Sequence, residues 1–100
     1  MLDVEKISWN EEKNELLKVE RGVSFEDVVV AIRSDQLLAV EAGAPNYPHQ
    51  RLLVIEIRGY AYMVPVVISE QEIFLKTVIP SRRHTKRYLR PESDGSEEVS

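Results

Sequence analysis

The sequence contains no cysteine, and this absence removes two kinds of site from consideration. A chain without thiols can form neither a disulfide nor a thiolate metal centre. Long apolar runs are also missing, because no stretch approaches the roughly 20 residues that span a bilayer. The first six residues lack the basic and then apolar pattern of a signal peptide. We therefore expect a soluble, cytoplasmic protein that does not contact a membrane.

Histidine is scarce as well, with His49 and His84 as the only two in the chain. They lie far apart in the sequence, and no group of acidic residues stands at ligand spacing beside either, so we expect no metal site. The sequence also lacks a Walker loop, a nucleophile elbow and a dinucleotide-binding fingerprint. We accordingly expect no cofactor.

The chain length allows one domain with a core of modest size. It has 100 residues, of which 43% are apolar. The last ten residues are polar and acidic, a composition typical of disorder. We expect a single domain over residues 1–90 and a disordered acidic tail over residues 91–100.

One segment, from Lys76 to Arg90, contains no acidic residue. It holds His84 and six of the 13 Lys and Arg residues, namely Lys76, Arg82, Arg83, Lys86, Arg87 and Arg90. The formal net charge of -4 hides this segment, because four of the 17 acids belong to the tail and the remaining acids only equal the bases in number. A local positive field of this kind attracts phosphates, so nucleic-acid binding is compatible with the overall charge.

Two helices are predicted in the N-terminal third. Asn10 is a good N-cap, and we expect a short, mostly solvated helix from Glu11 to about Val19. Ser24 predicts the start of a second helix, since an acid follows three residues later. Apolar residues then recur at helical spacing, at Phe25, Val28, Val29 and Ile32.

Strands are predicted in the second half. Residues 37–40 are a short apolar run, residues 42–50 have the composition of a loop, and residues 51–57 and 60–67 are rich in β-branched and aromatic residues. Arg58 and Gly59 between the last two have the length and chemistry of a tight hairpin. Pro65 indicates that its strand lies at an edge or carries a bulge.

A last strand and helix complete the predicted fold. Over residues 72–78, Ile73, Leu75 and Thr77 point to one face, and Glu72, Phe74 and Lys76 to the other, which places Lys76 on the open face. Pro80 should end this strand, and Ser81 should cap a short helix through Leu89. The prediction is an α+β fold in which two N-terminal helices pack on an antiparallel sheet of about four strands, followed by a C-terminal helix.

The basic segment has two interpretations. A run of charge is typical of a solvated helix face. Here, however, Lys76 on a strand leads into a helix start that carries Arg82 and Arg83, and helix starts and guanidinium groups both bind phosphate. Arg51 and Arg58 on the same sheet would then join them to hold an RNA backbone.

Aromatic residues and histidine are secondary candidates. Tyr62 and Tyr88 could stack on bases, although tyrosines in strands more often pack half-buried. An exposed His84 between cations would stay neutral and could accept a proton from a ribose 2′-hydroxyl, although a lone histidine usually has no role.

Two strings in the N-terminal half resemble the opening of the BrnT-type toxin family. Residues 9–13 read Trp-Asn-Glu-Glu-Lys and residues 22–28 read Gly-Val-Ser-Phe-Glu-Asp-Val. They are similar to that family's W-D-E-x-K and K-H-G-V-S-F-E-E-A strings at the same spacing. Arg51, Gly59 and the segment Pro80-Ser81-Arg82 resemble its R-x-x-x-x-G and I-S-A-R patterns more loosely.

The resemblance covers about residues 5–90 and implies both a fold and partners. Such toxins have a RelE-like fold and are metal-independent ribonucleases of bacterial type II toxin–antitoxin pairs. The resemblance implies a ribbon-helix-helix antitoxin as partner, and contact with operator DNA only through the antitoxin complex. It implies roles for Lys13, Arg51, Lys76 and Arg82. The chain departs from the family where Glu20-Arg21 replaces Lys-His, and where Tyr88 falls near a family glutamate.

The leading hypothesis is therefore a RelE-like toxin that cleaves RNA by attack of a 2′-hydroxyl on the adjacent phosphate and so inhibits translation. The candidate catalytic residues are Arg51, Lys76, Arg82, Arg83 and His84, and the candidate RNA-binding residues are Arg58, Lys86, Arg87, Tyr62 and Tyr88. The antitoxin is expected to cover the open sheet face near Lys76 and the final helix. The alternatives are an inactive BrnT-like protein that only binds its antitoxin or nucleic acid, and a nucleic-acid-binding module unrelated to toxins.

Overall fold

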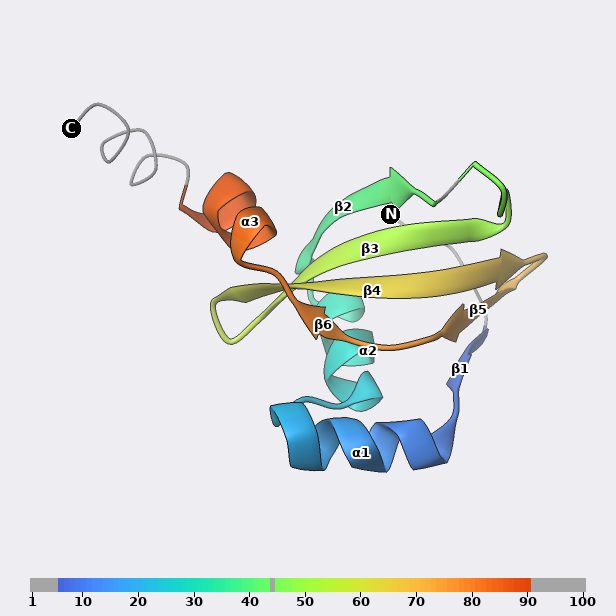
Figure 1. Ribbon diagram of the computed structural model, residues 1–100, viewed down its shortest axis with the longest axis horizontal. Helices are drawn as coiled ribbons and strands as arrows, with labels where there is room; N and C mark the ends of the chain where they lie inside the picture. The colour runs from blue at the N-terminus through green and yellow to red at the C-terminus, as the bar shows by residue number, and fades with distance from the viewer. Residues whose placement is uncertain (1–5, 44, 91–100) are drawn as a thin grey trace.

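The computed structural model describes residues 6–43 and 45–90, which form an α+β fold around one mixed sheet (Figure 1). The tail predicted at residues 91–100 lies outside the described residues. In chain order the elements are β1 (Lys6–Trp9), α1 (Glu11–Arg21), α2 (Phe25–Arg33), β2 (Leu37–Ala42), β3 (Gln50–Ile57), β4 (Tyr60–Ser69), β5 (Glu72–Leu75), β6 (Ile79–Pro80), α3 (Arg82–His84) and the π-helix η1 (Thr85–Leu89).

The sheet has the strand order β1-β5-β4-β3-β2, and the short β6 pairs with β4 beyond the end of β5. All pairings are antiparallel except that of β1 with β5, where Ile7 lies opposite Ile73 in parallel register. The prediction of a purely antiparallel sheet of about four strands was therefore wrong. The strand β1 was missed because it has only four residues and its partner strand lies more than 60 residues further along the chain.

The helix α1 begins as its capping residues predict. The Asn10 side chain accepts a hydrogen bond from the Lys13 N–H, and Gly22 ends the helix in the left-handed region at φ 69°. The helix runs two residues beyond the predicted end, to Arg21. The Arg21 guanidinium donates a 2.6 Å hydrogen bond to the Val78 carbonyl, which links the last turn of α1 to the segment between β5 and β6.

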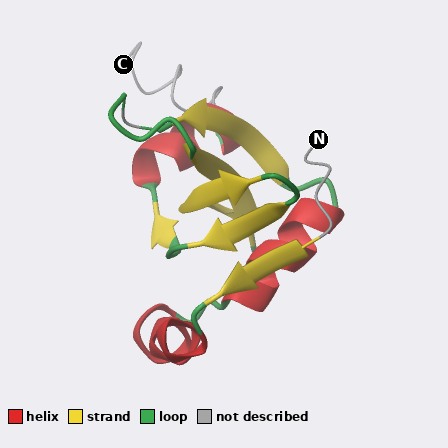
Figure 2. Cartoon of the chain, turned by 90° about the vertical axis from the view of Figure 1, so that its right-hand side faces the viewer, coloured by secondary structure: helices red, strands yellow, loops and turns green. Residues whose placement is uncertain are grey.

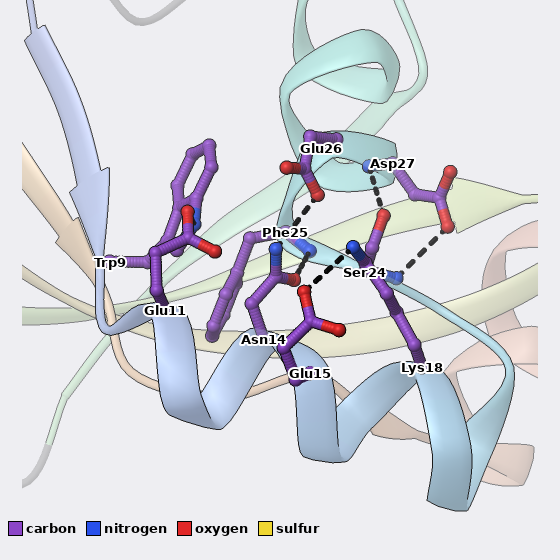
Figure 3. Close-up of polar contacts among 9 residues, drawn as sticks. All are labelled: Trp9, Glu11, Asn14, Glu15, Lys18, Ser24, Phe25, Glu26 and Asp27. Atoms are coloured by element: carbon purple, nitrogen blue, oxygen red, sulfur yellow. Dashed lines mark hydrogen bonds and ion pairs between the residues drawn. The ribbon is translucent and has the colours of Figure 1, made fainter.

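A buried asparagine joins α1 to α2 (Figure 3). Asn14 is completely buried; its Oδ1 accepts from the Phe25 N–H at 2.7 Å and its Nδ2 donates to Glu26 Oε1 at 2.9 Å. The hydrogen bond from the Asn14 side chain, together with one from the Glu26 backbone N–H, lowers the pKa of the Glu26 carboxyl. Ser24 and Asp27 form the expected capping box at the start of α2.

The core lies between the two N-terminal helices and one face of the sheet. It includes the predicted Phe25, Val28 and Ile32 of α2. The Trp9 and Phe25 rings stack with centroids 5.7 Å apart, which fastens β1 to the same core. From the sheet it takes the side chains of Leu53, Ile55, Ile57, Val64, Val66, Ile73 and Leu75.

The predicted hairpin between β3 and β4 is confirmed. Arg58 and Gly59 both have positive φ, at 51° and 81°, as in a type I′ turn, and Ile57 pairs with Tyr60 across it. The prediction of an edge position for Pro65 was wrong, because β4 is the central strand. Pro65 instead faces the interruption between β5 and β6, where a strand N–H is not required, and its carbonyl accepts from the Lys76 N–H at 2.9 Å.

The C-terminal segment forms a third layer on the opposite face of the sheet. The predicted strand over residues 72–78 ends early, at Leu75, and Pro80 lies within β6 instead of after a strand. As predicted, Ser81 caps the helix that follows. On this face Val54 and Ala61 are completely buried, and α3 and η1 contact β4. Figure 2 shows helical segments on both sides of the strands.

Candidate nucleic-acid interface

The C-terminal helical segment is fixed to the sheet through a buried histidine. His84 is 2% exposed; its Nδ1 lies 2.7 Å from Ser81 Oγ and its Nε2 lies 3.3 Å from Glu41 Oε2 on β2. Ser81 Oγ already accepts from the His84 backbone N–H. The arrangement is satisfied when the serine O–H donates to Nδ1 and the Nε2–H donates to the Glu41 carboxylate.

Thr85 makes the second attachment. Its Oγ1 accepts from the Ala61 N–H and donates to the Ser81 carbonyl, each at 2.8 Å, and both bonds are buried. The Ser81 N–H in turn donates to the Ala61 carbonyl at 3.0 Å. The start of α3 is thereby bonded directly to the backbone of β4, so its position relative to the sheet is well defined.

These attachments turn the cations of the segment outward. The exposed members are Arg82, Arg83, Lys86, Arg87 and Arg90. Tyr88 is half-buried between the His84 ring, stacked at 6.1 Å, and the Arg87 guanidinium, which lies 5.6 Å from its ring centre. Because no acid occurs between Lys76 and Arg90, nothing in the segment itself neutralises this field. We call these five exposed residues the basic helix face.

Lys76 lies near this face. It follows β5, its N–H bonds to the Pro65 carbonyl, and its side chain is exposed, in agreement with the predicted open-face position. Pro65 and the Ala61 that anchors α3 belong to the same strand, β4. Lys76 and the basic helix face therefore border one side of the sheet.

Arg51 and Arg58 do not join this group. Arg51 lies opposite Val66, on the helix-covered face, and its guanidinium donates to the carbonyls of Pro48 and Gln50 at 2.7 and 2.8 Å. Arg58 lies in the hairpin, where it donates to the Gly22 carbonyl at 2.8 Å. The structure thus separates these two arginines from the basic helix face. Lys13 is separate from that face as well, because it lies on α1.

Tyr62 lies on the helix-covered face of the sheet, opposite to the face next to α3. It lies opposite Ile55, packs against the core and meets the Tyr60 ring edge-on with centroids 5.8 Å apart. Its position is that of a packing tyrosine.

His84 was predicted to be exposed, and that prediction was wrong, because its side chain is buried between Ser81 and Glu41. The Ser81-x-x-His84 spacing is the signal that could have indicated the buried bond, because a helix cap reaches the residue three positions on. Glu41 gave no such signal, as it lies 43 residues away from His84 in the sequence.

Phe74 was not considered as a site residue, although the alternation over residues 72–78 placed it on the open face. It is 38% exposed there.

Within residues 6–43 and 45–90, no three side chains of the metal-binding types gather into a cluster. No helix in the described part of the chain has the length and apolar character needed to cross a membrane. Comparison with known proteins gives no match to any family model, to any curated protein or to any solved structure.

Proposed function

We propose that this chain is the toxin component of a bacterial type II toxin–antitoxin system, a RelE-like, metal-independent endoribonuclease that cleaves RNA and inhibits translation. The support from the sequence is the resemblance at residues 9–13 and 22–28. The support from the fold is a basic face suited to a phosphate backbone.

The observation that carries the proposal is the anchoring of the basic helix face. His84 and Thr85 hold the helical segment on the sheet through buried bonds, while Arg82 and Arg83 point to solvent. Because the backbone that carries these arginines is already held, only their side chains lose freedom when they bind a phosphate, which favours both affinity and electrostatic stabilisation of a transition state.

In the proposed reaction a ribose 2′-hydroxyl gives its proton to water and its oxygen attacks the adjacent phosphate. A 2′,3′-cyclic phosphate forms, the bond from phosphorus to the 5′-oxygen breaks, and the 5′-oxygen takes up a proton from water. Arg82, Arg83 and Lys76 would stabilise the negative charge that develops on the phosphate oxygens. Tyr88 is half-buried beside the Arg87 guanidinium, which lies 5.6 Å from its ring centre, so part of its side chain remains accessible.

One observation favours the second candidate function, an inactive protein that only binds its antitoxin or nucleic acid. His84, the histidine offered as general base, is 2% exposed and both of its ring nitrogens are engaged. A base in that position cannot reach a substrate hydroxyl without breaking the bonds that hold the helix.

The test combines growth and cleavage. Expression of the chain alone should slow bacterial growth, and the purified protein should cleave single-stranded RNA in the presence of EDTA. Arg82→Ala should lower the cleavage rate on the order of 10²-fold. Arg33→Ala, which removes an exposed cation from the end of α2, is the matched control and should keep full activity.

If the protein binds RNA but neither cleaves it nor slows growth, the ribonuclease proposal is wrong and the second candidate, a protein that only binds, is supported. An adjacent reading frame that encodes a ribbon-helix-helix protein, and that restores growth when co-expressed, would support the proposed partner. If the Arg82→Ala variant is as toxic as wild type, the phosphate does not bind at the basic helix face.

A further inference from the structure

The face of the sheet next to the C-terminal helical segment is apolar and only partly covered. Along β4, Met63, Pro65 and Val67 share this face, and Leu52 of β3 lies opposite Pro65 on it. All four side chains are half-buried. The helical segment covers the end of the face near Ala61 and leaves these residues accessible.

Phe74 stands at the other end of this surface. It lies opposite Val67 in the pairing of β5 with β4, and 38% of it is exposed. Lys76 follows two residues later, beside Pro65. An exposed phenylalanine ring and a lysine therefore lie next to each other on the same side of one chain segment.

The distance along the surface suits an extended ligand. From Val67, beside Phe74, to Ala61, where Thr85 anchors the helix, β4 advances six residues, or about 20 Å. An aromatic ring, a lysine and the basic helix face thus lie one after another beside successive residues of β4.

We infer that Phe74 is a base-stacking residue for single-stranded RNA, whose backbone runs from Lys76 to the basic helix face. The inference rests on the proposed function and adds the form of the substrate. Flat apolar bases and anionic phosphates match an apolar strip bordered by cations. A double helix keeps its bases stacked inside and would not offer a base to this ring.

Charge distinguishes this occupant from an apolar protein segment. Glu72 is the acid nearest in sequence to Phe74 on this face, and its carboxylate accepts a 2.7 Å hydrogen bond from Ser8. The cations at the opposite end have no acid within their own segment. Two further acids border this face, because Glu41 lies opposite Leu52 and bonds to His84, and Glu56 lies opposite Ala61. Lys76 and the five cations of the basic helix face outnumber these three acids, so the balance of charge is positive and favours a polyanion.

The experiment measures binding of a labelled single-stranded RNA to the full chain by fluorescence anisotropy. Phe74→Ala should weaken binding about 5- to 150-fold, the range for loss of one base–aromatic stack. Phe74→Trp should bind as tightly as wild type, whereas Phe74→Leu, which keeps apolar bulk without a ring, should bind weakly. Val30→Ala, at a valine 62% exposed on α2, is the surface control.

An abasic oligonucleotide with the same backbone isolates the stacking. The difference between wild type and Phe74→Ala should disappear on this probe. Equal losses on both probes, or no loss on either, would overturn the inference.

The inference and the proposed function can fail separately. If Arg82→Ala weakens RNA binding but Phe74→Ala does not, Phe74 has no role in RNA binding and the basic helix face keeps its own. If Phe74→Ala weakens only the binding of a protein partner, the strip is a protein-docking surface. If wild type binds no RNA at all, both proposals fall.

Discussion

At the scale of single residues, two buried polar side chains each hold one element of the fold against another. Asn14 joins α1 to α2 through bonds to the Phe25 N–H and the Glu26 carboxylate, and Thr85 joins the C-terminal segment to β4. Such groups are costly to leave unpaired inside a protein, so each specifies one arrangement of the elements that it connects.

Removal of the Thr85 hydroxyl tests the contact between the C-terminal segment and β4. Thr85→Val keeps the side-chain shape but leaves the buried Ala61 N–H without its acceptor, and we expect a loss of about 1–3 kcal/mol in the free energy of unfolding. Urea denaturation measures the change. Thr77→Val is a suitable control, because Thr77 is half-buried without comparable bonds in the described chain, and it should change stability by less than about 0.5 kcal/mol. Equal effects would mean that the hydroxyl is not the anchor.

The contact between Asn14 and Glu26 should make the stability of the protein depend on pH. The Asn14 amide lowers the pKa of Glu26 from its ordinary value of 4.5, so the stabilisation is present above pH 4.5 and is lost as the pH falls through the lower, folded-state pKa. The wild type should be more stable than Glu26→Gln at pH 7, and the gap should narrow toward pH 3. Urea midpoints across this range measure the gap, which will be small because Glu26 is exposed. A gap that stayed constant would exclude the carboxylate as its cause.

At the scale of elements, the helices were predictable where a cap marks their start. Asn10, Ser24 and Ser81 each accept the backbone hydrogen bond that their residue type and position predict. The strand β1 was not predictable, because no local signal reveals that Lys6–Trp9 pairs with Glu72–Leu75. The same limit applied to the site: the cations of the final helix follow from the sequence, whereas the bond of His84 to Glu41 depends on how β2 reaches that helix.

The basic helix face makes a quantitative prediction about salt. For single-stranded nucleic acid, each neutralised phosphate contributes about -0.7 to the slope of log affinity against log salt concentration. The double variant Arg82→Ala, Arg83→Ala should therefore flatten the slope for RNA binding by about 1.4 if each arginine holds one phosphate. Anisotropy titrations between low and physiological salt provide the slope. An unchanged slope would show that these arginines contact no phosphate, and Arg33→Ala should leave it as in wild type.

At the scale of the whole molecule, acidic and basic charge are concentrated at the same end of the sequence. Residues 91–100 contain four acids and no base, directly after the basic segment. We expect a chain that ends at Arg90 to unfold at the same temperature as the full chain and to bind RNA at least as tightly, because four competing negative charges are gone. Thermal unfolding and RNA titration at low salt test both parts. Weaker binding or a lower unfolding temperature would mean that these ten residues contribute to the fold or the interface.

The parallel pairing of β1 with β5 has a consequence for synthesis of the protein. Ser8 and Glu72, which are bonded across this pair, are 64 residues apart. At the usual 5–20 residues per second, about 3 to 13 s separate the making of β1 from that of its partner strand. During that interval Trp9 and Phe25 can stack, but the sheet cannot close. The basic helix face is made after every strand of the sheet, because Arg82 follows β6, so a chain that has been made only as far as β6 has the complete sheet but not yet this face.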